Sequence, residues 1–286
     1  MANLGNPTGT NEILRKFNLT AQKRYGQNFL IDSNILEKIV SAAGIGKDDT
    51  VLEIGPGIGT LTQYLCENAQ KVIAVEIDRQ MIPVLEYTLS DYDNVRIINE
   101  DVLKLDLCTL IGEESPERPI KVVANLPYYI TTPIIMELLE MDVPVESITV
   151  MIQKEVAERM QEGPGSKDYG ALSLAVQYYS NAEIKTIVSP NCFIPRPNVE
   201  SAVIKLEKYE KCPVEVKDSK LMFRIIKGAF EQRRKTLTNA LSHSSAYRTD
   251  KDEIVKALDQ MGKNPNIRGE ELTLEDFARL SDILGQ

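Results

Sequence analysis

Short apolar runs rich in Val and Ile alternate with amphipathic segments over the first two thirds of the chain. Such near-continuous apolar runs are typical of buried parallel strands, and the first three of them end at acidic residues. Helical spacing of apolar residues follows most of these runs, so the pattern predicts an α/β fold: a Rossmann-like sheet with helices on both faces. The five strands expected on this basis cover residues 51–54, 71–78, 95–101, 120–124 and 148–152.

The remaining pattern predicts where this sheet ends. Two further runs, at residues 182–188 and 199–206, are expected to be final, antiparallel strands. Beyond them only helical spacing remains. We therefore expect three parts: a partly disordered extension over residues 1–22, the α/β domain over 23–209, and a small all-helical domain over 210–286. Other expected features are a disordered start (1–10), a short helix (11–19), a surface loop (103–119), a mobile loop (163–168), and C-terminal helices at 221–230, 235–241, 253–261 and 274–284.

A glycine-rich turn follows the first strand. Gly55, Gly57 and Gly59 follow the acidic strand end at Glu53, and the next residue is Thr60. Glycine lets the main chain approach a ligand closely. A dinucleotide fingerprint requires its third glycine at position 60, and a carboxylate repels pyrophosphate but attracts an ammonium or sulfonium group. This turn resembles the first motif of class I methyltransferases, which favours S-adenosylmethionine (SAM) over NAD.

Acidic residues also end the second and third strands. Glu76 and Asp101 are expected at the same sheet edge as the glycine turn, because parallel strands end together there. An acid at the end of the second strand typically binds ribose hydroxyls. Three such ends favour a nucleoside-containing cofactor.

The fourth strand delivers Asn125-Leu126-Pro127-Tyr128 to this edge. An amide oxygen of Asn125 and a main-chain carbonyl, of Leu126 or Pro127, can accept both hydrogens of an exocyclic amine. The lone pair of the amine nitrogen then points at an activated methyl group, while Tyr128 offers an aromatic ring on which the base can stack. The single histidine, His243, lies far from these motifs, and such a reaction needs no strong base. The alternative interpretation is a structural strand-exit turn.

The charge of the chain is unevenly distributed. The formal net charge is −9, yet residues 205–235 carry ten Lys and Arg against five Asp and Glu, and residues 1–30 carry four against one. Three consecutive cations, Arg233, Arg234 and Lys235, favour contact with phosphate, although a solvated helix face is the alternative. Four scattered cysteines lack metal or redox spacing, and no leader or membrane segment is recognisable. These features predict a cytoplasmic protein without a metal.

Five segments, which follow one another along the chain, resemble those of a known family. Together they resemble the ribosomal RNA adenine N6-dimethyltransferases, and among these the bacterial KsgA/RsmA branch most of all. The resemblance runs from about residue 23 to the C-terminal helices. The segments are Gly26-Gln27-Asn28-Phe29-Leu30, Glu53-Ile54-Gly55-Pro56-Gly57, Asn125-Leu126-Pro127-Tyr128, Phe193-Ile194-Pro195-Arg196-Pro197-Asn198-Val199 and Phe230-Glu231-Gln232-Arg233-Arg234-Lys235-Thr236-Leu237.

The resemblance implies an activity and a partner. SAM-dependent dimethylation of two adjacent adenosines is expected, in a hairpin loop near the 3′ end of 16S rRNA, by a monomer acting late in small-subunit assembly and without a membrane. For the cofactor, the resemblance implies that Asn28 and Leu30 border the SAM site, that Gly55 approaches the methionine part of SAM, that Glu76 binds its ribose and that Asp101 binds its adenine amine. For the target, it implies that Asn125 lies where SAM and the target amine meet and that Tyr128 and Phe193 lie on the two faces of the target base. A core role for Phe193 is the alternative.

Three other functions remain open on the sequence alone. A sister enzyme could dimethylate large-subunit rRNA, although the segment 230–237 argues against it. A non-catalytic assembly factor could bind SAM for structure only, against which the intact Asn125–Tyr128 motif argues. An NAD-dependent dehydrogenase lacks its third glycine and a catalytic His or Lys in a suitable place.

Overall fold

The computed structural model describes residues 4–19, 26–141 and 143–285, which form two compact units. The first contains Met1–Ala157 and Ala182–Lys208, and the second contains Glu158–Asn181 and Tyr209–Gln286. The second unit thus includes residues 158–181, which the boundary expected from the sequence places in the α/β domain. Each unit is described by itself.

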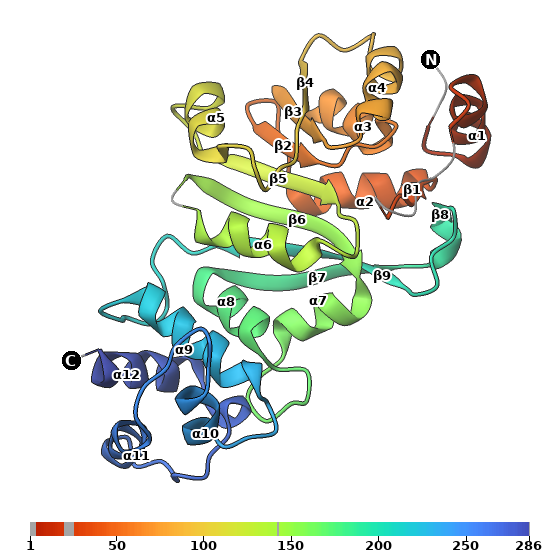
Figure 1. Cartoon of the computed structure of the whole chain (residues 1–286). Coiled ribbons are helices and arrows are strands. Elements are labelled where there is room, and N and C mark those ends of the chain that lie inside the picture. Colours follow the sequence, from red (N-terminus) through yellow and green to blue (C-terminus); the bar gives the residue numbers. More distant parts are fainter. Residues whose placement is uncertain (1–3, 20–25, 142, 286) are drawn as a thin grey trace. The chain divides into compact units, whose positions relative to one another are not determined.

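A seven-stranded sheet forms the centre of the first unit, in the order β4-β3-β2-β5-β6-β9-β7 (Figure 1). The first five strands of this order, from β4 to β6, are parallel, whereas β9 is antiparallel to β6 in a register that pairs Gln153 with Ser201. The predicted α/β fold is confirmed. The strands are β2 (Thr50–Ile54), β3 (Lys71–Glu76), β4 (Val95–Asn99), β5 (Ile120–Asn125), β6 (Val145–Gln153), β7 (Ser180–Val188) and β9 (Ser201–Lys208).

The strand order reverses direction at β2. The chain adds β3 and β4 on one side of β2 and then returns to add β5 and β6 on the other. Ligands of open α/β sheets bind outside the carboxyl ends of strands at such a switch point. This topology therefore places the ends of β2 and β5, with Glu53 and Asn125, beside one crevice.

Helices cover the sheet because their apolar stripes match its apolar faces. Helix α2 (Ser33–Ala43) begins where Asp32 accepts hydrogen bonds from the amides of Asn34 and Ile35, as its position before the apolar stripe predicts. Its buried residues pack with those of α3 (Thr60–Asn68) against one sheet face. The other elements are η2 (Arg79–Met81), α4 (Ile82–Thr88), α5 (Leu107–Glu114), α6 (Thr131–Glu140) and α7 (Lys154–Gln161).

Two segments expected to lack structure are helical. Helix α1 (Pro7–Lys16) begins at Asn6, whose side chain accepts a hydrogen bond from Gly9, so the prediction that residues 1–10 are disordered is wrong for Pro7 onward. Its buried Ile13 belongs to a core cluster with residues of α4 and the glycine turn. The expected loop at 103–119 contains α5, which Asp106 caps and which buries three apolar residues at helical spacing.

A second, two-stranded sheet joins distant parts of the first unit. Strand β1 (Phe29–Leu30) pairs antiparallel with β8 (Phe193–Ile194), which follows η3 (Pro190–Cys192). The amide of Ile31 also donates to the carbonyl of Cys192 (2.8 Å). The Gln-Asn-Phe-Leu segment is therefore paired with the segment that carries Phe193.

The second unit is helical and has its own core. Tyr169 is fully buried in it, donates from its hydroxyl to the carbonyl of Leu272 (3.0 Å), and contacts Phe230 edge-to-face. The amide of Gly165, within the 163–168 loop, donates to the carbonyl of Glu270 (2.8 Å). This hydrogen bond joins the loop, which the sequence predicts to be mobile, to η4 (Gly269–Glu271). The other helices of the unit are α8 (Ala171–Tyr179), α9 (Ser219–Glu231), α10 (Leu237–Ser242), α11 (Lys251–Gln260) and α12 (Leu274–Leu284).

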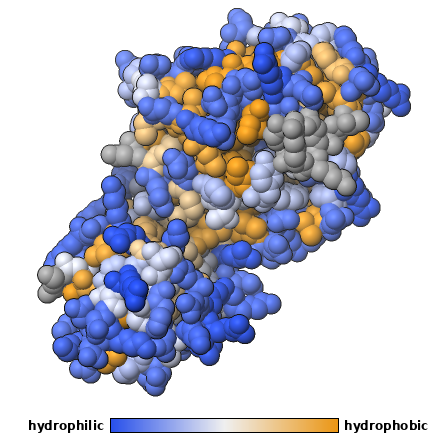
Figure 2. Space-filling model, in the orientation of Figure 1, coloured by the Kyte–Doolittle hydropathy of each residue, from blue (hydrophilic) through white to orange (hydrophobic). Residues whose placement is uncertain are grey.

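Surface polarity differs between the two units in the view of Figure 2. Hydrophilic residues dominate the visible surface of the helical unit, whereas a band of hydrophobic residues crosses that of the first unit. Within the described ranges, no helix combines the length and the apolar character needed to span a membrane.

Candidate active site

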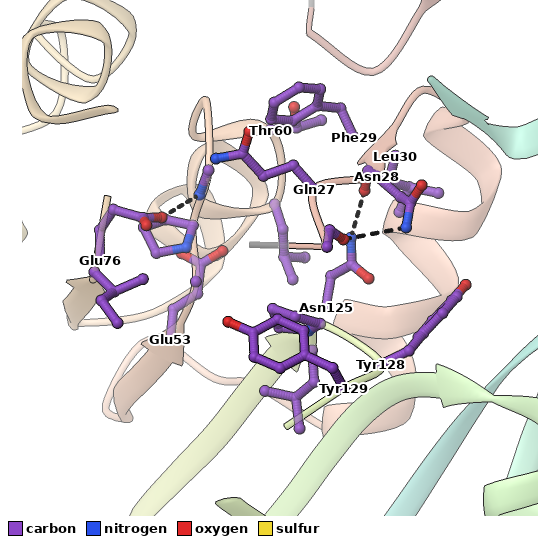
Figure 3. A pocket seen from close by; sticks show the side chains of 18 residues that line it. Gln27, Asn28, Phe29, Leu30, Glu53, Thr60, Glu76, Asn125, Tyr128 and Tyr129 are labelled. Carbon is purple, nitrogen blue, oxygen red and sulfur yellow. Dashed lines mark hydrogen bonds between the residues drawn. The ribbon is translucent and has the colours of Figure 1, made fainter. Parts of the chain in front are cut away.

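A pocket in the first unit lies at the carboxyl ends of β2, β3 and β5, where the topology predicts one (Figure 3). Four segments far apart in the sequence form its wall: the stretch into β1, the glycine turn, the end of β3 and the end of β5. The residues that line it are Gly26, Gln27, Asn28, Phe29, Leu30, Glu53, Gly55, Pro56, Gly57, Thr60, Leu61, Glu76, Ile77, Asn125, Leu126, Pro127, Tyr128 and Tyr129.

The glycine turn has no room for side chains at two positions. Gly57 has φ +59°, and a Cβ there would lie 3.3 Å from the Phe29 ring. Gly59 has φ +88°, and its Cβ would lie 2.9 Å from the hydroxyl of Thr88. Left-handed φ values favour glycine, and close neighbours exclude larger residues. Gly57 lines the pocket and therefore presents main chain to it where the sequence predicts a cofactor, whereas Gly59 lets the turn pack closely on Thr88.

Glu76 closes the cofactor side of the pocket. Its Oε2 accepts a hydrogen bond from the amide of Gly57 (3.0 Å), and its Oε1 accepts one from the amide of Asp78 (2.8 Å). Burial raises the pKa of Glu76, while these two amides oppose that shift. Each carboxylate oxygen keeps a second lone pair, so Glu76 is held in place and can still accept two hydroxyl hydrogens.

Glu53 is the most deeply buried acid of the pocket, with an exposed fraction of 1%. Its Oε2 has no hydrogen-bond partner among the described residues. Burial, and secondarily the neighbouring charge of Glu76, raises the pKa of Glu53 to about 8. A buried carboxylate oxygen without a partner makes the ionised form unfavourable unless a cation lies close to it. The pocket therefore fits a cofactor that carries positive charge.

A second, smaller cavity shares Gly55, Ile77, Pro127 and Tyr129 with the first. Asp101, which the sequence predicts as the adenine ligand, lines this cavity rather than the main pocket. Its Oδ1 accepts a hydrogen bond from the amide of Leu103 (3.1 Å), which fixes the carboxylate in the turn after β4. Apolar side chains dominate the rest of the lining. The chemistry of this lining therefore suits an apolar ring that carries an amine.

Asn125 lies at the meeting point of these walls. Its Nδ2 donates to the main-chain carbonyl of Asn28 (3.1 Å), a contact that Figure 3 shows beside the hydrogen bond from the Asn28 side chain to Gly26. The Asn125 amide is thus held from one side. Its oxygen is turned away from this contact.

The two main-chain carbonyls after Asn125 differ in their availability. The carbonyl of Pro127 accepts hydrogen bonds from the amide of Ile130 and from the hydroxyl of Thr131, both at 3.2 Å. Both lone pairs are then engaged. The carbonyl of Leu126 receives no hydrogen bond within the described part of the chain. Of the two alternatives left open by the sequence, the geometry favours Leu126 as the second acceptor.

Two tyrosines leave the end of β5 toward opposite sides of Asn125 (Figure 3). Tyr128 is half-buried, and its hydroxyl lies 2.6 Å from the Oγ of Ser201, the first residue of β9. Tyr129 points toward the Glu53 and Glu76 side and is 57% exposed. The predicted stacking residue is therefore braced by a hydroxyl partner.

Two groups of predicted site residues lie outside the pocket. Phe193 is 3% exposed and belongs to the core cluster that also contains Leu30, so its stacking role stays a prediction. The predicted phosphate contacts lie in the turn after α9 of the helical unit. There Arg233 is held by protein groups, whereas Arg234 and Lys235 are exposed.

Several pocket residues were not predicted. Gln27 donates to Asp78 (3.0 Å) and so joins the segment before β1 to the end of β3. Phe29 covers Gly57, and Tyr129 lies at the mouth. Their only sequence signal was adjacency to Asn28 and Tyr128, because no local pattern shows that these segments meet.

A doubly wound sheet with a glycine turn and a pocket at the carboxyl ends of its strands is the arrangement in which such folds bind nucleoside-containing ligands. Together with the family match and the solved structures given below, it makes the chain a class I SAM-dependent methyltransferase. The model of one family, described as ribosomal RNA adenine dimethylase, matches residues 18–285. The chain belongs to the ribosomal RNA adenine dimethylase family.

Relatives and solved structures agree with this assignment. The chain is 60% identical to a ribosomal RNA small subunit methyltransferase A of Lachnoclostridium phytofermentans, over 100% of this chain and 99% of the relative. It is 55% identical to the protein of that name in Alkaliphilus metalliredigens, over 98% of each. A crystal structure of a dimethyladenosine transferase from Plasmodium falciparum superimposes with a TM-score of 0.72 at 26% identity, covering 88% of this chain and 95% of that one.

A crystal structure of the 23S rRNA methyltransferase ErmE is also similar, with a TM-score of 0.65 at 26% identity, over 91% of this chain and 100% of that one. Family and fold together make this chain an enzyme that uses SAM to dimethylate adenine in ribosomal RNA. The dehydrogenase and the non-catalytic interpretations are therefore excluded.

Proposed function

We propose that the protein dimethylates the N6 amines of two adjacent adenosines in a hairpin loop near the 3′ end of 16S rRNA, acting as a monomer late in small-subunit assembly. The observation that carries this proposal is the convergence of Asn125, Tyr128 and Glu76 in one pocket. Sequence similarity favours the small subunit over the large one, because relatives named for the small subunit share 49–60% identity, against 26% for the large-subunit enzyme ErmE.

The proposed cofactor site uses three segments of the pocket, namely the stretch into β1, the glycine turn with the end of β2, and the end of β3, together with Asp101 of the second cavity. Glu76 would accept the ribose hydroxyls, Asp101 the adenine amine, and Gly55 and Gly57 would approach the methionine part, whose ammonium Glu53 would satisfy. Asn28 and Leu30 would border it from the β1 side. When bound, SAM supplies a methyl group that its sulfonium already activates.

The proposed chemistry of the chain is orientation of the target amine. The Asn125 oxygen and the Leu126 carbonyl would accept the two amine hydrogens, which keeps the nitrogen lone pair out of conjugation with the ring and available for bonding. Tyr128 would stack on the displaced base, with Phe193 on its other face once that ring is exposed. Pro127 makes the turn rigid. Water can take the proton that the amine loses, so no protein base is required.

The proposed RNA contacts lie in the helical unit, where Arg234 and Lys235 are exposed. Binding of the charged backbone there would position the hairpin without reading its sequence.

Transfer of labelled methyl groups from SAM tests the substrate. Purified small and large subunits that lack the modification are incubated with the protein, and the labelled rRNA is cut into fragments. Label confined to the 3′-terminal fragment of 16S rRNA is expected. Label in 23S rRNA would support the sister activity and contradict the proposal.

A further inference from the structure

The Asn125 side chain is oriented by a main-chain atom 97 positions away in sequence. Its Nδ2 lies 3.1 Å from the carbonyl oxygen of Asn28. A carbonyl oxygen can only accept, so the amide face toward it has to be the donating NH2 group. The amide oxygen therefore faces the other way. This choice follows from the chemistry of the partner.

The Asn28 carbonyl is itself held in place. The Asn28 side chain donates to the carbonyl of Gly26 (3.2 Å), which closes a short turn. Gly26 has φ +58°, and a Cβ there would lie 3.3 Å from the Tyr129 ring and 3.4 Å from the Cβ of Pro127. The turn thus packs directly on the residues that follow Asn125.

The next residues anchor the turn from its other end. Phe29 pairs with Ile194 and Leu30 with Phe193 in the β1–β8 sheet. The Asn125 end is fixed too, because the amide of Leu126 donates to the carbonyl of Met151 (3.1 Å) in β6. Both partners of the Asn125–Asn28 hydrogen bond are therefore fixed to sheets.

We propose that the main-chain carbonyl of Asn28 is a positioning group for catalysis, which locks the Asn125 amide so that its oxygen receives the target amine. This inference rests on the proposed function. It gives the segment before β1 a role toward the target base in addition to its border with the cofactor.

The physical reason is that an asparagine amide is nearly symmetric in shape. Rotated by half a turn, it would present NH2 to the NH2 of adenine, and two donors cannot bond. Preorganised acceptors stabilise a transition state because no reorganisation is needed during the reaction. The Asn28 carbonyl removes the unproductive rotamer by offering a partner only to the productive one.

Asn125→Asp tests this inference through its pH profile. The ionised aspartate has only acceptors, so one oxygen would face the Asn28 carbonyl oxygen and be repelled. The protonated form can donate its O–H to that carbonyl and keep the other oxygen for the amine. The ratio of variant to wild-type kcat should therefore rise about tenfold per pH unit as the pH is lowered, until the carboxyl is protonated.

Other titrating groups cancel in this ratio. The groups that face the site are Glu53 on β2, Glu76 on β3, and Tyr128 and Tyr129 after β5, and the wild type has them all. The residues 26–30 carry no titratable side chain. A ratio that does not change between about pH 9 and about pH 6 overturns the inference, whether the variant is fully active or inactive throughout.

A second pair of variants covers the case in which Asn125→Asp does not bind SAM or fold. Gly26→Ala places a Cβ 3.3 Å from the Tyr129 ring and 3.4 Å from the Cβ of Pro127, so the turn or these neighbours must shift, whereas Gly44→Ala imposes the same left-handed strain (φ +63°) with no atom within 4 Å. We expect kcat to fall roughly fivefold or more for Gly26→Ala and to stay near wild type for Gly44→Ala.

Equal kcat values for the two variants would contradict the inference. A wild-type protein that transfers no methyl group to rRNA would overturn the proposed function, and this inference with it. A flat pH ratio with an active wild type overturns the inference alone.

Discussion

Arg233 donates a hydrogen bond from its guanidinium to the main-chain carbonyl of Tyr169 (2.7 Å), and its charge lies 3.4 Å from the carboxylate of Glu270. Its Cζ also lies 5.7 Å from the centre of the Phe230 ring. These contacts join the turn after α9 to the segment before α8 and to η4. Arg233 therefore contributes to the fold of the unit, whatever it does toward RNA.

The three adjacent cations should consequently behave differently when replaced. Arg233→Ala should lower the stability of the helical unit, by about 1 kcal/mol because the side chain is 37% exposed and its ion pair is screened. The double variant Arg234→Ala, Lys235→Ala should leave stability unchanged. It should weaken binding to the small subunit and reduce the salt slope by about two.

Thermal unfolding and salt-dependent particle binding separate the two effects. SAM affinity, measured on the same samples, should be unaffected in the double variant. An unchanged salt slope there would remove Arg234 and Lys235 from the RNA contact.

Glu76 should be a cofactor ligand, and its replacement should also lower stability because the amides of Gly57 and Asp78 lose their acceptor. Loss of charge-assisted hydrogen bonds to a ribose costs about 1.5–3 kcal/mol, so Glu76→Ala should weaken SAM binding roughly tenfold or more. Glu86→Ala, an exposed position on α4, serves as the control and should bind SAM normally. Calorimetry that finds unchanged affinity in folded Glu76→Ala would exclude Glu76 from the site.

Tyr128 should act through its ring. Base–aromatic stacking is worth about 1–3 kcal/mol, so Tyr128→Ala should slow methyl transfer roughly five- to 150-fold. Tyr128→Phe should lose much less, and only through the contact to Ser201 that orients the ring. Ser201→Ala should therefore match Tyr128→Phe, and the double variant should be no slower than either.

Single-turnover rates measured with saturating SAM test this prediction. If Tyr128→Phe were as slow as Tyr128→Ala, the hydroxyl would take part in the chemistry and the stacking account would be wrong. Additive losses in the double variant would show that Ser201 acts elsewhere.

Glu53 should make stability and SAM binding depend on pH. Burial raises its pKa from 4.5 in the unfolded chain to about 8. The folded protein holds the Glu53 proton more tightly than the unfolded chain does. The stability that this contributes is fully present below about pH 4.5 and is lost as the pH rises through about 8, at up to roughly 1.4 kcal/mol of unfolding free energy per pH unit. Glu53→Gln, which stays neutral, should lose less stability over this range than the wild type.

Urea unfolding at several pH values measures this difference, with Glu86→Gln as the exposed control. Because a cationic cofactor favours the ionised carboxyl, SAM affinity of the wild type should rise toward pH 8. The affinity of Glu53→Gln should be lower and nearly independent of pH. Parallel pH dependence in the two proteins would contradict the assignment.

Local pattern was sufficient for the elements that bury a continuous apolar face. The strands and the helices α9, α11 and α12 lie where spacing predicts them, because burial imposes that spacing. Helix α5 was missed although Leu107, Leu110 and Ile111 have helical spacing, since Glu and Pro residues dominate its surroundings. The polar composition of this segment therefore predicted a loop, although it contains a short apolar stripe at helical spacing.

Contacts between distant segments could not be predicted. The two-residue strands β1 and β8 have no periodicity to detect, yet their pairing carries Asn28 to Asn125. Charge gave the same weight to Arg233 and Arg234, whereas tertiary contacts distinguish them. The pocket residues at strand ends, Glu53, Glu76 and Asn125, were predicted to lie at one edge, since topology alone brings them together.

Mass spectrometry of nucleosides tests the central claim most directly. Small subunits that lack the modification are incubated with SAM and either the wild-type protein or Asn125→Ala, and their 16S rRNA is digested completely. The account predicts about two N6,N6-dimethyladenosines per 16S rRNA with the wild type and almost none with the variant, which removes the amide acceptor. The prediction is contradicted if incubation with the wild type increases a methylated nucleoside other than N6-modified adenosine, or if Asn125→Ala forms as much dimethyladenosine as the wild type.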